Sequence, residues 1–224
     1  MKGRIAEIFD SVQGEGLYLG EKQIFVRFFG CNLNNCNFCD TRLDFFEEYD
    51  APGLFNKIKS YGNGFHSISF TGGEPLLQKD FLKEVLEMTK GASYRNYLET
   101  NAILFEALEE VIGYLDIIAM DFKLPSSTGR APCWKAHKKF LEIAVTKELF
   151  IKMVICNSTR TEDLMQALKL IKESNRAVTI ILQPNSNEQG FMLERKIEYY
   201  RTLCEDNSFA SCIIPQMHKL IGAK

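Results

Sequence analysis

The sequence has no long uncharged apolar run and no excess of charge of one sign. Its 27 Lys and Arg residues nearly balance 29 Asp and Glu residues, which leaves a formal net charge of −2. A strongly basic surface for nucleic acid or an anionic membrane is therefore not indicated. A membrane-spanning helix would need about 18 or more apolar residues in succession, and the N-terminal MKGRIAEIFD lacks the apolar stretch of a signal peptide. We expect a cytoplasmic protein that binds neither nucleic acid nor membrane.

Internal repeats, low-complexity tracts and an obvious linker are also lacking. A hydrophobic content of 46% with 25% charged residues is ordinary for a globular protein, which excludes a disordered or fibrous chain. A chain of 224 residues is long enough to bury a substantial core. We expect one domain over residues 1–224.

The seven cysteines are odd in number and unevenly spaced. Cys31, Cys36 and Cys39 fall within nine residues of each other, whereas four others are scattered singly, at Cys133, Cys156, Cys204 and Cys212. A secreted disulfide scaffold would be short and evenly stocked with cysteine. The cluster therefore predicts a metal site, and the scattered cysteines are expected to be small buried hydrophobes.

Apolar runs rich in β-branched and aromatic residues alternate with segments of helical periodicity. Strands are predicted at 23–29, 66–70, 94–98, 116–122, 149–155 and 177–182. Helices are predicted near 53–60, 79–90, 104–114, 134–146, 160–174 and 188–205, before an extended run at 209–215. Thr159 and Glu162 are expected to form a capping box. The alternation predicts an α/β fold with about six parallel strands, and the length favours an incomplete TIM-type barrel over a complete one of about 250 residues.

Polar or glycine-rich residues follow five of the predicted strands. In parallel α/β folds, functional groups gather where the carboxyl ends of the strands meet. The five signatures therefore predict an active site at one rim of the sheet; they are Cys31–Thr41, Thr71-Gly72-Gly73-Glu74-Pro75, Glu99-Thr100-Asn101, Asp121-Phe122-Lys123 and Gln183-Pro184-Asn185.

The spacing Cys31-x4-Cys36-x2-Cys39 suits two kinds of site. Three thiolates can bind three irons of a four-iron cubane and leave the fourth iron open to another ligand. A zinc site would need a fourth N or S ligand, which His66 or a more distant cysteine could supply. The cysteines alone leave this choice open.

The three-cysteine loop after the first predicted strand, together with Gly72-Gly73-Glu74-Pro75 after the second, resembles the radical S-adenosylmethionine superfamily. Within that superfamily the sequence is similar to the 7-carboxy-7-deazaguanine synthase family. This likeness rests on residues 7–16 (EIFDSVQGEG), 25–27 (FVR), 30–33 (GCNL), Cys36, 39–41 (CDT), 99–101 (ETN) and 215–222 (PQMHKLIG). The family's loop usually has three residues between its first two cysteines. Here it has four, so we expect the extra residue to bulge outward.

The resemblance implies a 4Fe-4S cluster on Cys31, Cys36 and Cys39, and S-adenosylmethionine as the second cofactor. The residues that it assigns to S-adenosylmethionine are Phe38, Cys39, Asp40, Gly73, Asp121, Lys123, Gln183 and Asn185. Glu74-Pro75 could instead be only a turn and a helix start, because Pro suits the first helical position. Lys123 could likewise be only a solvated lysine after a strand.

The implied substrate is 6-carboxy-5,6,7,8-tetrahydropterin, which the family converts to 7-carboxy-7-deazaguanine by ring contraction with loss of ammonia, in queuosine and 7-deazapurine biosynthesis. A carboxylate can accept two adjacent N–H donors of the pterin ring. The expected substrate residues are Gln13, Gly14, Glu15, Arg27, Thr71, Glu99, His218 and the terminal carboxylate of Lys224. Arg27 in an apolar strand could also be a structural salt bridge, and His218 an ordinary satisfied histidine. No catalytic side chain is assigned beyond the cofactors.

The resemblance further implies Mg²⁺ on the hydroxyl of Thr41, an electron donor such as flavodoxin or ferredoxin, and a homodimer. Thr41 could alternatively only cap the loop.

Two other functions remain possible at this point. Another radical enzyme, such as a glycyl-radical activase, would keep the cluster but has no reason to carry residues 13–16, Arg27 and the His218 tail. A non-enzymatic metal-binding module would explain the cysteines but not five polar strand ends. The basic stretch of Lys135, His137, Lys138 and Lys139 is expected to be a solvated helix face and not a nucleic-acid site.

Overall fold

The computed structural model of the chain describes residues 1–33, 36–39, 44–188, 190–217, 219 and 222. Its strands are β1 (Lys2–Val12), β2 (Lys22–Phe28), β3 (Glu47–Asp50), β4 (Ser67–Gly72), β5 (Asn96–Thr100), β6 (Ile117–Asp121), β7 (Glu148–Ile155), β8 (Thr179–Pro184) and β9 (Ser211–Ile213). The α-helices are α1 (Ala51–Lys59), α2 (Lys79–Gly91), α3 (Phe105–Val111), α4 (Pro125–Thr128), α5 (Trp134–Ala144), α6 (Thr161–Glu173) and α7 (Phe191–Asp206). Three short 3₁₀ turns complete the elements: η1 (Gly16–Tyr18), η2 (Pro75–Gln78) and η3 (Ile112–Tyr114).

All of these strands form one sheet in the order β3-β1-β2-β4-β5-β6-β7-β8-β9, with β3 and β9 at its edges. Every pair from β2 to β9 is parallel, whereas β1 lies antiparallel to both β2 and β3. The predicted α/β fold with an incomplete barrel is confirmed, including all six predicted strands. The sheet is larger than predicted, because β9 extends the parallel series and β1 and β3 add an antiparallel edge.

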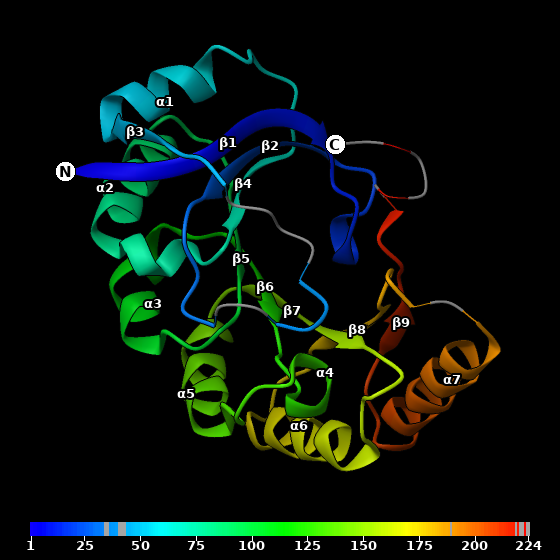
Figure 1. Ribbon diagram of the computed structural model, residues 1–224. Helices are drawn as coiled ribbons and strands as arrows, with labels where there is room; N and C mark the ends of the chain where they lie inside the picture. The colour runs from blue at the N-terminus through cyan, green and yellow to red at the C-terminus, as the bar shows by residue number, and fades with distance from the viewer. Residues whose placement is uncertain (34–35, 40–43, 189, 218, 220–221, 223–224) are drawn as a thin grey trace.

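In Figure 1 the longer helices, α2, α3, α5, α6 and α7, lie around the outside of the curved sheet. In β2, Ile24, Val26 and Phe28 point outward into the main hydrophobic core, which continues through α2 and α3. In the same strand, Gln23, Phe25 and Arg27 alternate with them and face inward, because successive side chains of a strand point to opposite faces. The inner face therefore carries many polar side chains. Its apolar residues include the stacked rings of Phe9 and Phe25 and a small cluster of Tyr97, Ile117, Ala119, Phe150 and Ile181.

Gly72 ends β4 in a conformation that only glycine adopts without strain. Its φ is +125°, and a Cβ at this position would lie 2.4 Å from both the backbone N and the backbone O of Phe28. This close approach of two strand ends allows the chain to turn directly into Gly73 and Glu74. The backbone N–H of Gly73 then donates to Phe28 O (3.1 Å), and that of Glu74 donates to Gly30 O (2.8 Å).

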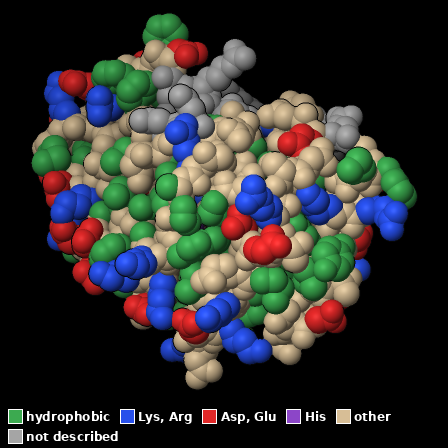
Figure 2. Space-filling model, turned by 60° about the horizontal axis from the view of Figure 1, so that its bottom comes forward, with side chains coloured by type: hydrophobic (Ala, Val, Ile, Leu, Met, Phe, Trp, Pro, Cys, Tyr) green, Lys and Arg blue, Asp and Glu red, His purple; other side chains and the backbone are tan. Residues whose placement is uncertain are grey.

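The basic stretch on α5 is only partly the solvated face that we expected. Lys135, Lys138 and Lys139 are exposed, but His137 is fully buried against the ring of Phe122. Figure 2 shows acidic and basic side chains intermingled on the face that it presents. Of the described helices, none combines the length and the apolar character that crossing a membrane requires.

The predicted capping box at the start of α6 is wrong. The N-cap residue is Arg160, and its side chain makes no capping hydrogen bond. The Thr159 hydroxyl is buried, where it accepts from the backbone N–H of Cys156 (2.7 Å) and pairs with the hydroxyl of Ser127 (2.7 Å). Thr159 thus joins the end of β7 to α4 instead of capping the helix.

This arrangement predicts that Thr159→Val lowers the free energy of unfolding by about 1–3 kcal/mol, because a buried N–H and a buried hydroxyl lose their partner. Thr159→Ser keeps the hydroxyl and should cost less than about 1 kcal/mol. Glu162→Ala would be costly if the capping box existed. Here it should change the free energy of unfolding by less than about 0.5 kcal/mol. Urea denaturation of the three variants measures these values. If Glu162→Ala lowered the free energy of unfolding as much as Thr159→Val, the capping box would be supported after all.

Candidate active site

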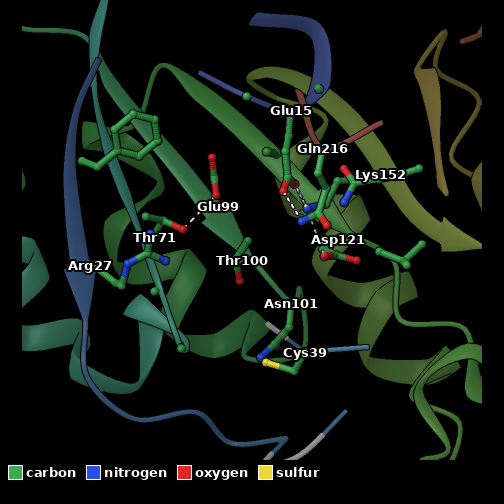
Figure 3. A pocket seen from close by; sticks show the side chains of 18 of the residues that line it. Glu15, Arg27, Cys39, Thr71, Glu99, Thr100, Asn101, Asp121, Lys152 and Gln216 are labelled. Carbon is green, nitrogen blue, oxygen red and sulfur yellow. Dashed lines mark hydrogen bonds and ion pairs between the residues drawn. The ribbon is translucent and has the colours of Figure 1, made fainter. Parts of the chain in front are cut away.

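A cavity of about 950 Å³ lies on the inner face of the sheet, at the carboxyl ends of its strands. Residues from all five polar signatures line it, as the sequence predicted. In Figure 3, Arg27, Thr71 and Glu99 lie on one side, and Glu15, Gln216, Lys152 and Asp121 lie on the other. Asn101 and Cys39 lie together below both groups.

The three clustered cysteines are free thiols that line this cavity. Asn101 lies beside them: its side-chain amide donates to Asn32 Oδ1 (2.6 Å) and reaches 4.0 Å from the sulfur of Cys31. In the described part of the chain, no three His, Cys, Asp or Glu side chains converge on a position for one metal ion. A tetrahedral zinc site needs such convergence. The proposed fourth zinc ligand, His66, immediately precedes β4 at the end of the strand opposite the cysteines.

Three cavity residues carry a buried oxygen that accepts no hydrogen bond from the described residues: Asn101 (Oδ1), Asp121 (Oδ1) and Gln183 (Oε1). Buried acceptors without a donor are costly and call for a partner. S-adenosylmethionine carries an ammonium and hydroxyl groups, which are donors of this kind. The thiols and these oxygens together fit an iron–sulfur cluster with S-adenosylmethionine beside it.

Lys152, which the sequence analysis missed, is at the centre of a charge cluster. Its Nζ lies 2.6 Å from Glu15 Oε2 and 3.4 Å from Asp121 Oδ2, and Lys123 approaches the same Asp121 oxygen at 2.8 Å. Burial alone would lower the pKa of Lys152, but the attraction of Glu15 and Asp121 outweighs it and raises that pKa. For Asp121, burial would raise the pKa, whereas Lys123 and Lys152 hold it below its usual value. Lys152 and Asp121 therefore both remain charged.

The hydrogen bonds that the Glu99 carboxylate accepts come from neutral donors. Its Oε1 accepts from Gln13 Nε2 (2.8 Å) and from the Ser69 hydroxyl (3.4 Å), and its Oε2 accepts from the Thr71 hydroxyl (2.8 Å). Nearby, Arg27 lines the cavity while its Nε lies 3.5 Å from Glu7 Oε2. The structural ion pair that was one interpretation of Arg27 thus exists, and the guanidinium still borders the cavity.

Glu74 has the structural role that was the alternative for this motif. Its buried carboxylate is the N-cap of η2, where it accepts from the N–H of Leu76, and Pro75 occupies the first turn. The same carboxylate accepts from the Thr100 hydroxyl (2.9 Å) and from the N–H of Asn101 (2.8 Å). Burial raises its pKa to about 7, against these hydrogen bonds, which lower it.

The other predicted residues are distributed as follows. The described ones line the cavity: Gln13, Gly14, Glu15, Phe38, Gly73, Lys123, Gln183 and Asn185 are all part of its wall. Lys123 also lies 5.0 Å from the centre of the Phe38 ring. Asp40, Thr41, His218 and Lys224 lie outside the described residues.

Gln216 is a second cavity residue to which the sequence analysis gave no role. Its amide donates to Glu15 Oε1 (2.7 Å), and its own oxygen accepts from the Ser186 hydroxyl (2.5 Å). The N–H of Met217 donates to Gly14 O (3.0 Å). The C-terminal segment is thereby attached to the 13–16 loop over the cavity. The motif PQMHKLIG contained the signal, but only His218 was selected from it.

Comparison with known proteins agrees with this site. Residues 25–193 match the model of the Radical SAM superfamily. The chain is 36% identical to 7-carboxy-7-deazaguanine synthase of Geobacter sulfurreducens, over 97% of this chain and 96% of that protein. It is 31% identical to the enzyme of the same name from Archaeoglobus fulgidus, over the full length of both.

Solved structures with low sequence identity share the fold. The crystal structure of QueE from Escherichia coli superimposes with a TM-score of 0.68 at 20% identity, covering 95% of this chain and 93% of that one. The archaeal TYW1 structure gives 0.59 at 14% identity, covering 83% of this chain and 72% of that one.

The charge cluster predicts that Lys152→Met lowers the free energy of unfolding by about 3 kcal/mol, because Glu15 and Asp121 lose a buried counter-ion. Lys138→Met is the matched control, since it removes the same charge from an exposed pair with Glu173, and should cost less than about 0.5 kcal/mol. Urea denaturation of the apoprotein compares the two. Equal effects would show that the Lys152 pairs add no more stability than a surface pair.

Proposed function

Because the chain belongs to the radical SAM superfamily and, within it, to the 7-carboxy-7-deazaguanine synthase family, we propose that it converts 6-carboxy-5,6,7,8-tetrahydropterin to 7-carboxy-7-deazaguanine. The reaction contracts the pterin ring with loss of ammonia and belongs to 7-deazapurine biosynthesis. The observation that carries this proposal is that one cavity brings three free thiols together with the carboxylates of Glu15 and Glu99. A metal-binding module would use the thiols but would have no use for the two carboxylates.

As a radical SAM enzyme the chain uses a 4Fe-4S cluster and S-adenosylmethionine, which when bound supply the radical chemistry. Cys31, Cys36 and Cys39 would hold the cluster. Asn101 would donate to the sulfur of Cys31, and hydrogen bonds of this kind tune such clusters. The unpaired oxygens of Asp121 and Gln183 would accept from S-adenosylmethionine.

The substrate would lie between the two groups of Figure 3. Glu99 presents a carboxylate to the N–H donors of the pterin edge, and Thr71 holds one of its oxygens in place. Arg27, at the rim of the same side, would attract the substrate carboxylate. Gln216 and Lys152 fix Glu15 on the opposite side.

The resemblance supports further parts of this proposal. Mg²⁺ would bind the hydroxyl of Thr41 next to the substrate, with His218 and the Lys224 carboxylate among the substrate contacts. A flavodoxin or ferredoxin would donate the electron. The chain would act as one domain in a cytoplasmic homodimer.

The activity predicts that anaerobic incubation with the carboxytetrahydropterin, S-adenosylmethionine, Mg²⁺ and a strong reductant yields 7-carboxy-7-deazaguanine, detected by mass spectrometry. Glu99→Gln should lower kcat/KM by at least about tenfold, because a charged acceptor is replaced by an amide. Release of 5′-deoxyadenosine without the deazaguanine product would sustain the radical chemistry and refute the substrate.

The cluster site predicts that Cys31→Ala, Cys36→Ala and Cys39→Ala each lose most of the iron and the brown colour after reconstitution. Cys212→Ala, which removes an exposed thiol from β9, should retain both. Iron analysis and the visible absorption spectrum give the result. Full iron content in any of the three loop variants would remove that cysteine from the ligand set.

A further inference from the structure

A chain of hydrogen bonds runs beneath the cavity along the inner face of the sheet. Gln13 Nε2, which donates to Glu99 (2.8 Å), also donates to Gln23 Oε1 (2.9 Å), and Gln23 Nε2 donates to the Ser67 hydroxyl (2.9 Å). His66 Nδ1 lies 3.0 Å from the same hydroxyl, and its Nε2 faces Arg95 NH1 at 2.7 Å. The chain thus connects a carboxylate in the cavity to a guanidinium at the other end of the strands.

The two ends fix which group donates at each step, and the donations meet at the Ser67 hydroxyl, which accepts from both Gln23 and His66. A guanidinium can only donate and a carboxylate can only accept. His66 Nε2 must therefore accept from Arg95, which leaves Nδ1 as its donor towards Ser67. At the other end, Glu99 requires the N–H₂ group of Gln13 to face it, and Gln13 Oε1 accepts from the backbone N–H of Glu15 (3.1 Å). The opposite orientation of either glutamine amide would bring two acceptors or two donors together.

The residues inside this chain of hydrogen bonds are also buried. Gln23 and Ser67 are 0% exposed and Gln13 is 3% exposed. Both amide hydrogens of Gln13 are used, one by Gln23 and one by Glu99. A buried amide that loses one partner has no water nearby to replace it, so it is held less firmly or shifts to find another.

We propose that Gln23 and Ser67 are positioning residues for the substrate, which act through Gln13. Gln23 fixes the orientation of the Gln13 amide, and Ser67 fixes that of Gln23. Gln13 in turn holds the Glu99 carboxylate and the backbone of Glu15 at their places in the cavity. This inference rests on the proposed function, in which Glu99 binds the pterin, and it adds two residues that themselves lie outside the cavity wall.

The test uses the reconstituted holoenzyme and measures separate KM values for the carboxytetrahydropterin and for S-adenosylmethionine. Gln23→Met keeps the side-chain length and removes both hydrogen bonds, while Ser67→Ala removes one oxygen. Thr89→Val is the control, because it removes a buried hydroxyl that bonds only within α2. Gln13→Ala and the double variant Gln13→Ala/Gln23→Met complete a cycle that shows whether Gln23 acts through Gln13.

We expect Gln23→Met to raise the KM for the pterin about tenfold and Ser67→Ala about threefold. In both variants the KM for S-adenosylmethionine should stay within about twofold of the wild-type value. In Thr89→Val the KM values for both substrates should do so. In the Gln13→Ala background, Gln23→Met should add less than about twofold. If Gln23→Met instead disturbed the structure in general, both KM values would rise together. The same rise would then also appear when Gln23→Met is added to Gln13→Ala.

Two results would overturn the inference in distinguishable ways. If Gln13→Ala raises the pterin KM but Gln23→Met and Ser67→Ala do not, the positioning role is wrong and the proposed function stands. If the wild-type enzyme makes no 7-carboxy-7-deazaguanine, the proposed function fails and the inference fails with it. Ser67→Ala keeps the test decisive should Gln23→Met not fold, because its loss of one buried oxygen disturbs the core least.

Discussion

One buried carboxylate, that of Glu74, joins the strand ends on which the site is built. Its backbone N–H binds Gly30 after β2, and its side chain binds the hydroxyl of Thr100 and the N–H of Asn101 at the end of β5. The residue itself follows β4. Because the cysteine loop leaves β2 and Asn101 reaches the sulfur of Cys31, both the backbone N–H and the carboxylate of Glu74 help to set the position of the thiols relative to the cavity. A neutral or shorter side chain would leave buried donors unpaired.

The inner face of the sheet adds a second constraint, since it buries charge where a complete barrel would bury aliphatic side chains. Lys152 is paired with Asp121 in the register between β6 and β7, and Glu15 reaches it from the loop after β1. The sheet tolerates these charges because opposite signs lie within hydrogen-bonding distance. Each pairing also fixes a side chain before a ligand arrives, which lowers the conformational entropy lost on binding.

The sequence allowed the parallel strands and the cavity rim to be predicted, because buried parallel strands are continuous apolar runs that end in polar residues. It did not reveal β1, whose pairing shifts register between Ile5 and Glu7 and whose exposed positions carry charges. Lys152 was missed since a lone lysine in an apolar strand has no partner in sequence; Glu15 lies 137 residues away. Thr159 was misassigned because Arg160 is the N-cap of α6, while the Thr159 hydroxyl bonds with the N–H of Cys156 and the hydroxyl of Ser127.

The two carboxylates that face each other across the cavity, those of Glu15 and Glu99, are not equivalent, although the sequence predicted the same role for both. Glu15 meets a buried ammonium on one oxygen and the Gln216 amide on the other, so its charge is largely compensated. The hydrogen bonds that Glu99 accepts come from an amide and two hydroxyls, none of which is charged. A carboxylate held by neutral donors keeps lone pairs and charge for further N–H groups. Under the proposed function, this difference favours Glu99 as the acceptor for the pterin edge, whereas Glu15 connects the 13–16 loop to Lys152 and Gln216.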